Sequence, residues 1–285
     1  MKKRVLSDSE VRKFNEHLME EERSAVTIEK YNRDIAALRR YSEGKEITKE
    51  LVIAYKQHLI ESGYAERSIN SMLAAINSLF QFLEWYDCRV KAIKLSPEIY
   101  RPDEKELTQK EYECLVKTAM EQGKEKLAVI LQTICGTGIR ISELQFITVE
   151  AVKRGEAKVH CKGKSRKIFI VDALKALLLE YVRKNHIKSG TIFLSKVGKP
   201  MNRTTVWRDM KNLCKAAKVN PSKVFPHNLR HLFARVFYKI EKDIAKLADI
   251  LGHSSINTTR IYIISTGKEH KRKMERMGLV RPMRV

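Results

Sequence analysis

Apolar side chains recur at helical spacing along the first third of the chain, which limits that region to packed α-helices. One stripe contains Ile69, Leu73, Ile76 and Phe80. Positions three and four residues apart lie on the same face of a helix, so each stripe predicts one buried face. Similar stripes, and the capping-box pattern of Ser7–Glu10, predict a small bundle of four helices.

A segment rich in proline and charge follows this bundle. Residues 94–106 contain Pro97 and Pro102, and proline cannot continue a helix. This segment is therefore predicted to be a linker. We expect a helical N-terminal domain over residues 1–93 and a second domain over residues 107–285, sizes that are ordinary for domains.

The second domain is predicted to be mainly helical with small β-hairpins, so the whole chain is assigned to an α+β class with few strands. Strand-like runs at Ala157–Cys161 and Lys167–Val171 flank a turn at Lys162–Ser165, and Ile192–Met201 is a second predicted hairpin. The predicted helices are residues 108–121, 126–136, 140–147, 172–185, 204–217, 227–239, 243–251 and 255–263.

The positive charge of the chain is concentrated in its second part. The formal net charge is +22. Residues 1–100 carry 17 Lys and Arg against 16 Asp and Glu, whereas residues 101–285 carry 39 against 18. Such a basic domain indicates a polyanionic partner, most simply a nucleic acid. A membrane surface is disfavoured because no basic amphipathic anchor helix stands out.

The five cysteines are odd in number and form no C-x-x-C pair. This spacing argues against a disulfide framework or a cysteine zinc site and fits a reducing cytoplasm. No signal peptide and no uncharged apolar span is readable in the sequence.

Two motifs that would indicate other kinds of site are incomplete. The stretch before Ser165 lacks the first glycine of a P-loop, and His227 and His231 lack the zincin glutamate, so no metal or other cofactor is expected.

Four segments concentrate side chains that can bind or attack a phosphate: Cys135–Leu144, Cys161–Lys167, Pro226–His231 and Leu251–Tyr262. Each has an ordinary explanation when taken alone, such as a surface ion pair, solvated charge or one tyrosine among ten. All four in this order form a specific pattern.

In these segments the sequence resembles the tyrosine recombinases, a family that includes Xer-type recombinases and the integrases of phages and conjugative elements. The family pattern is an arginine, a hairpin lysine, His-x-x-Arg, and a Gly-His turn with a tyrosine nine residues after that histidine. The matching residues here are Arg140, Lys162, His227, Arg230, His253 and Tyr262. The resemblance covers the whole chain and is strongest after residue 130.

This resemblance implies that DNA is cut and rejoined through a 3′-phosphotyrosine on Tyr262, without metal or ATP. A free phenol has a pKa of about 10, so the attacking group must lose a proton. His227 is expected to accept or orient that proton, and Lys162 to protonate the leaving 5′ oxygen. Lys164 and Lys167 lie close by, but Lys162 precedes the turn glycine as the family lysine does.

The two arginines are expected to hold the scissile phosphate. Guanidiniums bind non-bridging oxygens in a forked geometry that lysine cannot copy. Arg140 and Arg230 would form this clamp, His253 would donate a further hydrogen bond, and Glu143 would orient the site.

The family resemblance further implies a C-shaped two-domain clamp on double-stranded DNA, with a SAM-like, core-binding N-terminal domain and four protomers at synapsis. A basic amphipathic segment, Thr266–Met277, is expected to dock on a neighbouring protomer or on its own domain. The need for an accessory protein stays open. The residues expected to contact DNA are Lys164, Arg166, Arg33, Arg40, Lys56, Arg67, Arg203 and Arg260.

Several alternatives remain at this point. A type IB topoisomerase shares the chemistry but exchanges no partners, and a DNA-binding regulator could keep the fold without the reaction. An RNA-binding protein is disfavoured because RNP-like aromatic strands are missing. Within the family, the pattern does not separate a resolvase of chromosome dimers from a mobile-element integrase, which we favour.

Overall fold

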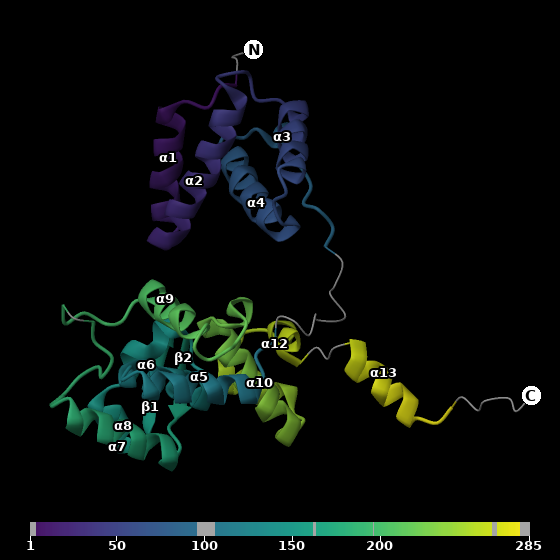
Figure 1. Cartoon of the computed structure of the whole chain (residues 1–285). Coiled ribbons are helices and arrows are strands. Elements are labelled where there is room, and N and C mark those ends of the chain that lie inside the picture. Colours follow the sequence, from purple (N-terminus) through teal and green to yellow (C-terminus); the bar gives the residue numbers. More distant parts are fainter. Residues whose placement is uncertain (1–3, 96–105, 162–163, 196, 264–266, 280–285) are drawn as a thin grey trace, which may run out of the picture. The chain divides into compact units, whose positions relative to one another are not determined.

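The computed structural model describes residues 4–95, 106–161, 164–195, 197–263 and 267–279 (Figure 1). Its contacts divide the chain into two units, Met1–Pro97 and Glu98–Val285. Each unit has its own hydrophobic core. Most of the predicted linker lies outside the described residues.

The N-terminal unit is the predicted helical bundle. Ile35, Leu38, Ile69 and Phe80 are fully buried in its core. The capping box at Ser7 is present and begins the first helix. The helices are α1 (Asp8–Glu20), α2 (Ala25–Ser42), α3 (Lys49–Glu61) and α4 (Glu66–Phe82), followed by a 3-10 turn at Tyr86–Cys88.

The C-terminal unit is mainly helical with one two-stranded antiparallel sheet among its described residues, so the predicted fold class is confirmed. Its first helices are α5 (Gln109–Glu121), α6 (Glu125–Thr137), α7 (Val149–Arg154) and α8 (Asp172–Lys184). The later ones are α9 (Arg203–Leu213), α10 (Pro226–Glu241), α11 (Ile244–Leu251), α12 (Ile256–Ile263) and α13 (Gly267–Arg276). Short 3-10 helices cover Ile141–Phe146 and Pro221–Lys223.

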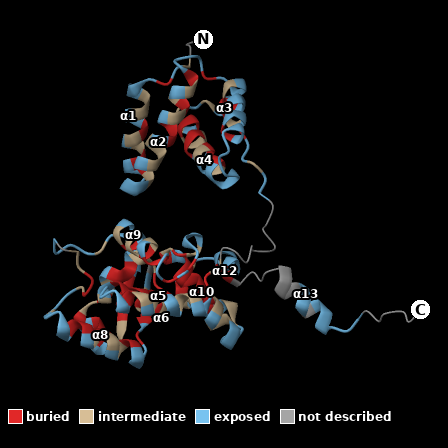
Figure 2. Cartoon of the chain, in the orientation of Figure 1, coloured by how far each residue is buried: buried red, intermediate tan, exposed pale blue. Residues whose placement is uncertain are grey.

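Helix α6 is the centre of this unit. It contacts α5, α8, α9 and α10, and most of its side chains are buried (Figure 2). The helix ends at Gly138, which adopts a left-handed conformation with φ of +64°. The chain therefore leaves the buried helix abruptly and enters the segment that carries Arg140.

The hairpin pairs β1 (Glu156–Cys161) with β2 (Lys164–Phe169). The second strand begins three residues earlier than predicted because Lys164 pairs with Cys161. Side chains alternate across the strands, so Val159 faces the core and Lys158 faces solvent. Arg166 pairs with Val159 and shares its inward face.

One local prediction was wrong, and another is confirmed only in part. The α-helix predicted over residues 140–147 is instead the 3-10 helix Ile141–Phe146, and the Glu143 side chain accepts from the backbone N–H of Arg140 at its start. The hairpin predicted at residues 192–201 is minimal: Leu194 and Pro200 form an isolated antiparallel bridge, and Met201 N–H donates to the Phe193 carbonyl.

Candidate active site

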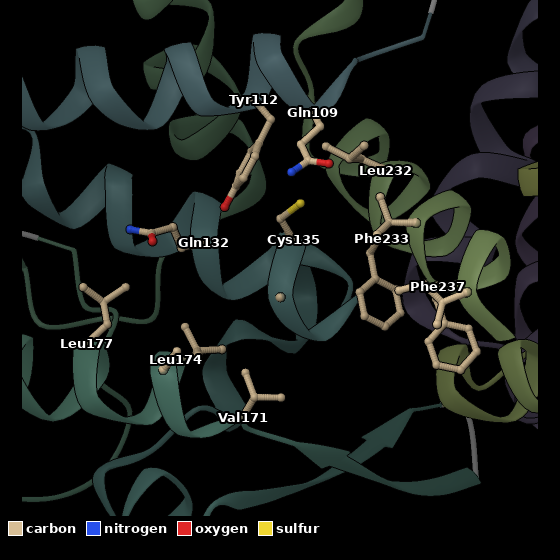
Figure 3. Close-up of a pocket in the computed structure, with 14 residues that line it drawn as sticks. Gln109, Tyr112, Gln132, Cys135, Val171, Leu174, Leu177, Leu232, Phe233 and Phe237 are labelled. Carbon is tan, nitrogen blue, oxygen red and sulfur yellow. The ribbon is translucent and has the colours of Figure 1, made fainter.

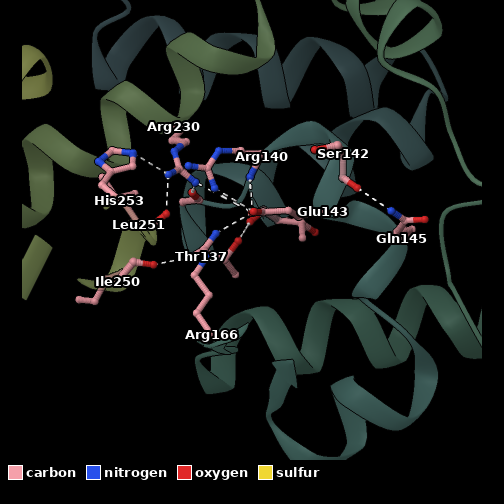
Figure 4. Close-up of polar contacts among 12 residues, drawn as sticks. Thr137, Arg140, Ser142, Glu143, Gln145, Arg166, Arg230, Ile250, Leu251 and His253 are labelled. Atoms are coloured by element: carbon pink, nitrogen blue, oxygen red, sulfur yellow. Dashed lines mark hydrogen bonds and ion pairs between the residues drawn. The ribbon is translucent and has the colours of Figure 1, made fainter. Parts of the chain in front are cut away.

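Arg230 is a buried cation that two helix ends hold in place (Figure 4). Its side chain, on α10, is 1% exposed. The guanidinium donates through Nη1 to the carbonyl of Gly138 and through Nη2 to that of Leu251, each at 2.6 Å. These carbonyls end α6 and α11, where the helix dipole is negative. The buried charge is therefore solvated by backbone rather than by water.

Glu143 is a buried carboxylate that gathers the arginines. It accepts from the backbone N–H of Arg140 at 2.8 Å and from Arg140 Nη1 at 3.0 Å. It also accepts from Arg166 Nη2 at 2.6 Å, and Arg230 Nη1 lies 4.0 Å away. Three guanidiniums thus surround one carboxylate. The excess positive charge makes this cluster suited to an anion such as a phosphate.

The cluster opens into a cleft of about 440 Å³. Arg140, Arg203, His227 and Arg230 line it, together with Trp207. The Arg140 side chain is 36% exposed, so this guanidinium can reach a ligand in the cleft while Glu143 holds it. Burial, with repulsion from Arg140, lowers the pKa of Arg230 to about 10, so Arg230 keeps its charge at neutral pH.

His253 connects this cluster to α12. Its Nδ1 lies 2.8 Å from Thr259 Oγ1, and its Nε2 lies 3.0 Å from Arg230 Nη2. An arginine N–H only donates, so Nε2 accepts and the proton of the neutral ring sits on Nδ1. His253 therefore supports Arg230, and donation to a phosphate would need a proton on Nε2.

Burial, followed by repulsion from Arg230, Arg140 and Arg166, lowers the pKa of His253 from 6.5 to about 4. We expect His253 to stay neutral in the folded protein down to about pH 5. In the unfolded chain this histidine binds a proton near pH 6.5. The contribution of neutral His253 to the free energy of unfolding is therefore fully present above that pH and is lost as pH falls toward 4. Imidazole carbon shifts from NMR titration of the folded protein would check this. A peptide of residues 250–258 should titrate near 6.5, and a transition of the folded His253 there would contradict the assignment.

Tyr262 lies on α12 with only 4% of its surface exposed. It packs against Leu247 and Leu251. Its hydroxyl is 3.5 Å from His227 Nε2, and it also interacts with the Arg230 side chain. The structure therefore brings Tyr262 together with His227, Arg230 and His253, while Arg140 reaches the same cluster through Glu143.

His231 is a neighbour of Tyr262 that the sequence did not single out. It follows His227 by four residues on α10. His231 is buried, and its ring centroid lies 4.1 Å from that of Tyr262, closer than the 5.6 Å for His227. The ring of His253 stacks at 5.3 Å. The phenol ring is thus held among imidazoles.

Gly138 allows Arg230 to reach its carbonyl, and its replacement should be costly. A Cβ at this position would lie 2.7 Å from Phe233 Cε1 in a left-handed backbone. We expect Gly138→Ala to lower the free energy of unfolding of the C-terminal unit by about 3 kcal/mol, from backbone strain plus overpacking. Gly190→Ala is the control, because Gly190 has a similar φ with nothing within 4 Å. It should cost about 1 kcal/mol in the same denaturant titration. Equal costs for the two variants would contradict the steric argument.

The remaining predicted residues are distributed as follows. Lys162 lies outside the described residues, and Lys164 begins β2. Arg33, Arg40, Arg67, Arg203 and Arg260 are exposed, as DNA contacts would need to be. Lys56 is half-buried and donates to the carbonyl of Lys91. Arg166 is only 13% exposed and is bonded internally, so the structure favours a role other than the expected phosphate contact.

A second cavity, of about 650 Å³, lies among α5, α6, α8 and α10 (Figure 3). Tyr112, Leu174 and Phe233 line it with Cys135, whose pKa burial raises to about 12. This apolar cavity holds no cluster of charged groups.

Among residues of described placement, no three His, Cys, Asp or Glu side chains gather as metal ligands. No helix formed by the described residues is long and apolar enough to cross a membrane.

Comparison with known sequences assigns the family. Residues 105–269 match the phage integrase family, and residues 11–86 match the SAM-like N-terminal domain of phage integrases. The chain is a tyrosine recombinase of the phage integrase family.

Individual relatives agree with this assignment. The recombinase is 30% identical to tyrosine recombinase XerD of Halalkalibacterium halodurans, over 83% of this chain and 86% of that protein. It is 29% identical to XerA of Pyrococcus furiosus over 98% of both chains. Its fold resembles a lambda integrase in a tetramer bound to a Holliday junction, with a TM-score of 0.73 and 22% identity over 89% of this chain and 76% of that one.

Proposed function

We propose that this recombinase cuts and rejoins duplex DNA at specific sites through a covalent 3′-phosphotyrosine on Tyr262. The observation that carries the proposal is the meeting of the Tyr262 hydroxyl, His227 and Arg230 in one protomer, beside a cluster with excess positive charge. A phenol beside a positive cluster is what attack on a phosphodiester requires.

In the proposed step the Tyr262 oxygen attacks the scissile phosphorus and its proton passes toward His227. The bond from phosphorus to the 5′ oxygen breaks, and Lys162 gives that oxygen a proton. Attack by another 5′-hydroxyl on the phosphotyrosine reverses these events. One phosphodiester is replaced by one phosphotyrosine and then restored, so no ATP is consumed.

Arg140 and Arg230 are proposed to hold the non-bridging oxygens. Two backbone carbonyls fix Arg230, and preorganised donors of this kind supply a large share of catalysis because they need not reorganise. Arg140 and Arg203 line the cleft and can extend the contact to neighbouring phosphates. The charge of residues 101–285 supports double-stranded DNA as the substrate.

A nicked suicide substrate tests this proposal, because cleavage near the nick releases a short strand and traps the enzyme on DNA. We expect a denaturant-resistant adduct whose peptide carries the nucleotide on Tyr262. An adduct on another residue would refute the nucleophile. Two marked sites then separate recombination from topoisomerase-like relaxation, since only a recombinase joins strands from different partners.

We further propose that residues 1–93 form a DNA-binding domain that closes a C-shaped clamp with residues 107–285, and that four protomers assemble at synapsis. Exposed Met274 and Met277 on the C-terminal segment suit docking on an apolar surface of a neighbouring copy. Action on DNA implies a cytoplasmic enzyme, and a mobile-element integrase is the favoured biological role.

A further inference from the structure

Arg166 joins three parts of the C-terminal unit. It projects from the inner face of β2, opposite Val159. Its Nη2 donates to Glu143 at 2.6 Å, and its Nη1 donates to the carbonyl of Ile250 near the end of α11 (Figure 4). One guanidinium therefore connects the hairpin, the carboxylate that holds Arg140, and the helix end that holds Arg230.

The backbone at Gly252 leaves space for the Arg166 side chain. Gly252 follows α11 with φ of +65°, and a Cβ there would lie 2.5 Å from Arg166 Cδ and 2.8 Å from Nε. Glycine leaves room for this side chain and adopts this left-handed backbone conformation without strain. With 13% exposure and both Nη atoms engaged, Arg166 is built into the site rather than offered to solvent.

Ala157, Val159 and Ile168 pack the hairpin into the core, and Arg166 adds a polar attachment on the turn side of Ile168. Among the described residues the sheet has two strands, and such a sheet is marginally stable by itself, so these attachments decide where the turn lies. The turn of this hairpin carries Lys162, the proposed general acid. An acid works only within hydrogen-bond reach of the leaving oxygen, and a misplacement of about 1 Å can cost about 100-fold in rate.

We propose that Arg166 is a positioning residue that fixes the base of the hairpin against Glu143 and α11, so that Lys162 reaches the leaving 5′ oxygen. The inference rests on the proposed role of Lys162. Arginine is required because its planar fork binds two acceptors in different directions at once, which a lysine ammonium on a flexible stem does poorly.

The test compares two leaving groups in single-turnover cleavage with saturating enzyme. One substrate has the normal 5′ oxygen, and the other has sulfur at that bridging position. A thiol has a pKa of about 8.5, so a thiolate departs without a general acid. We expect Arg166→Lys and Arg166→Met to cleave the oxygen substrate about 100-fold more slowly and the sulfur substrate within about threefold of the unchanged protein.

The control is Lys158→Met, which removes a cation from the solvent-facing side of β1 and should change neither rate. Circular dichroism and DNA affinity show whether a variant folds and binds. Equal losses on both substrates, or a normal rate for Arg166→Lys, would overturn the proposal. Lys162→Met separates the two claims. If sulfur rescues Lys162→Met but not the Arg166 variants, only the positioning role fails, and if it rescues neither, the proposed acid fails as well.

Discussion

Tyr262→Phe should reduce formation of the covalent DNA adduct by roughly 10⁴-fold or more, because no other group is proposed to form the bond to phosphorus. Phenylalanine keeps the ring that packs against Leu247, Leu251 and the neighbouring imidazoles. The fold and the affinity for duplex DNA should therefore change little, by less than about twofold in Kd. The measurement is the yield of adduct on a nicked substrate beside a binding titration.

Tyr238→Phe is the matched control, since Tyr238 packs on the same small core as Tyr262. It should form adduct at the normal rate. Adduct formed by Tyr262→Phe would show that another residue is the nucleophile. Loss of DNA binding in that variant would mean that the phenol acts in binding rather than in bond formation.

Glu143→Ala should destabilise the C-terminal unit by about 3–5 kcal/mol, the usual cost of removing one partner from a buried ion pair. The carboxylate is 1% exposed and lies among Arg140, Arg166 and Arg230, whose like charges would then face one another without compensation. For a unit of this size we expect thermal unfolding to shift down by about 10 °C.

Calorimetry of the intact protein would measure this shift. Glu180→Ala removes an exposed carboxylate from α8 and should change stability by less than about 0.5 kcal/mol. Phosphate or DNA should stabilise Glu143→Ala more than the unchanged protein, since an anion would restore the missing negative charge. A melting temperature that matches the control would show that Glu143 does not hold the cluster together.

A site residue could be predicted where its role follows from residue type and spacing, and could not where it follows from strand pairing or helix packing. Arg140, His227, Arg230 and Tyr262 could be chosen because their residue types and spacing form a recognisable pattern. Arg166 could not be distinguished from other hairpin cations, since its inward direction follows from the pairing with Val159. His231 was missed because burial on α10 depends on how α12 packs against that helix.

In the fold, too, elements marked by a local sequence pattern were predictable and the others were not. Helix starts marked by local chemistry, such as Ser7 with Glu10, were predictable because a capping box is a contact between residues three apart. The short helix α7 and the 3-10 segment before it were not, because their apolar runs are too brief to display a period.

One short stretch of chain connects the Arg230 anchor to the hydroxyl proposed to attack phosphorus; it contains Leu251, His253, Thr259 and Tyr262. Chimeric recombinases with new target preferences should therefore inherit residues 251–262 and α10 from the same parent. A crossover point inside this stretch would combine the Arg230 anchor of one parent with the Tyr262 segment of another, and the two would not be matched in packing.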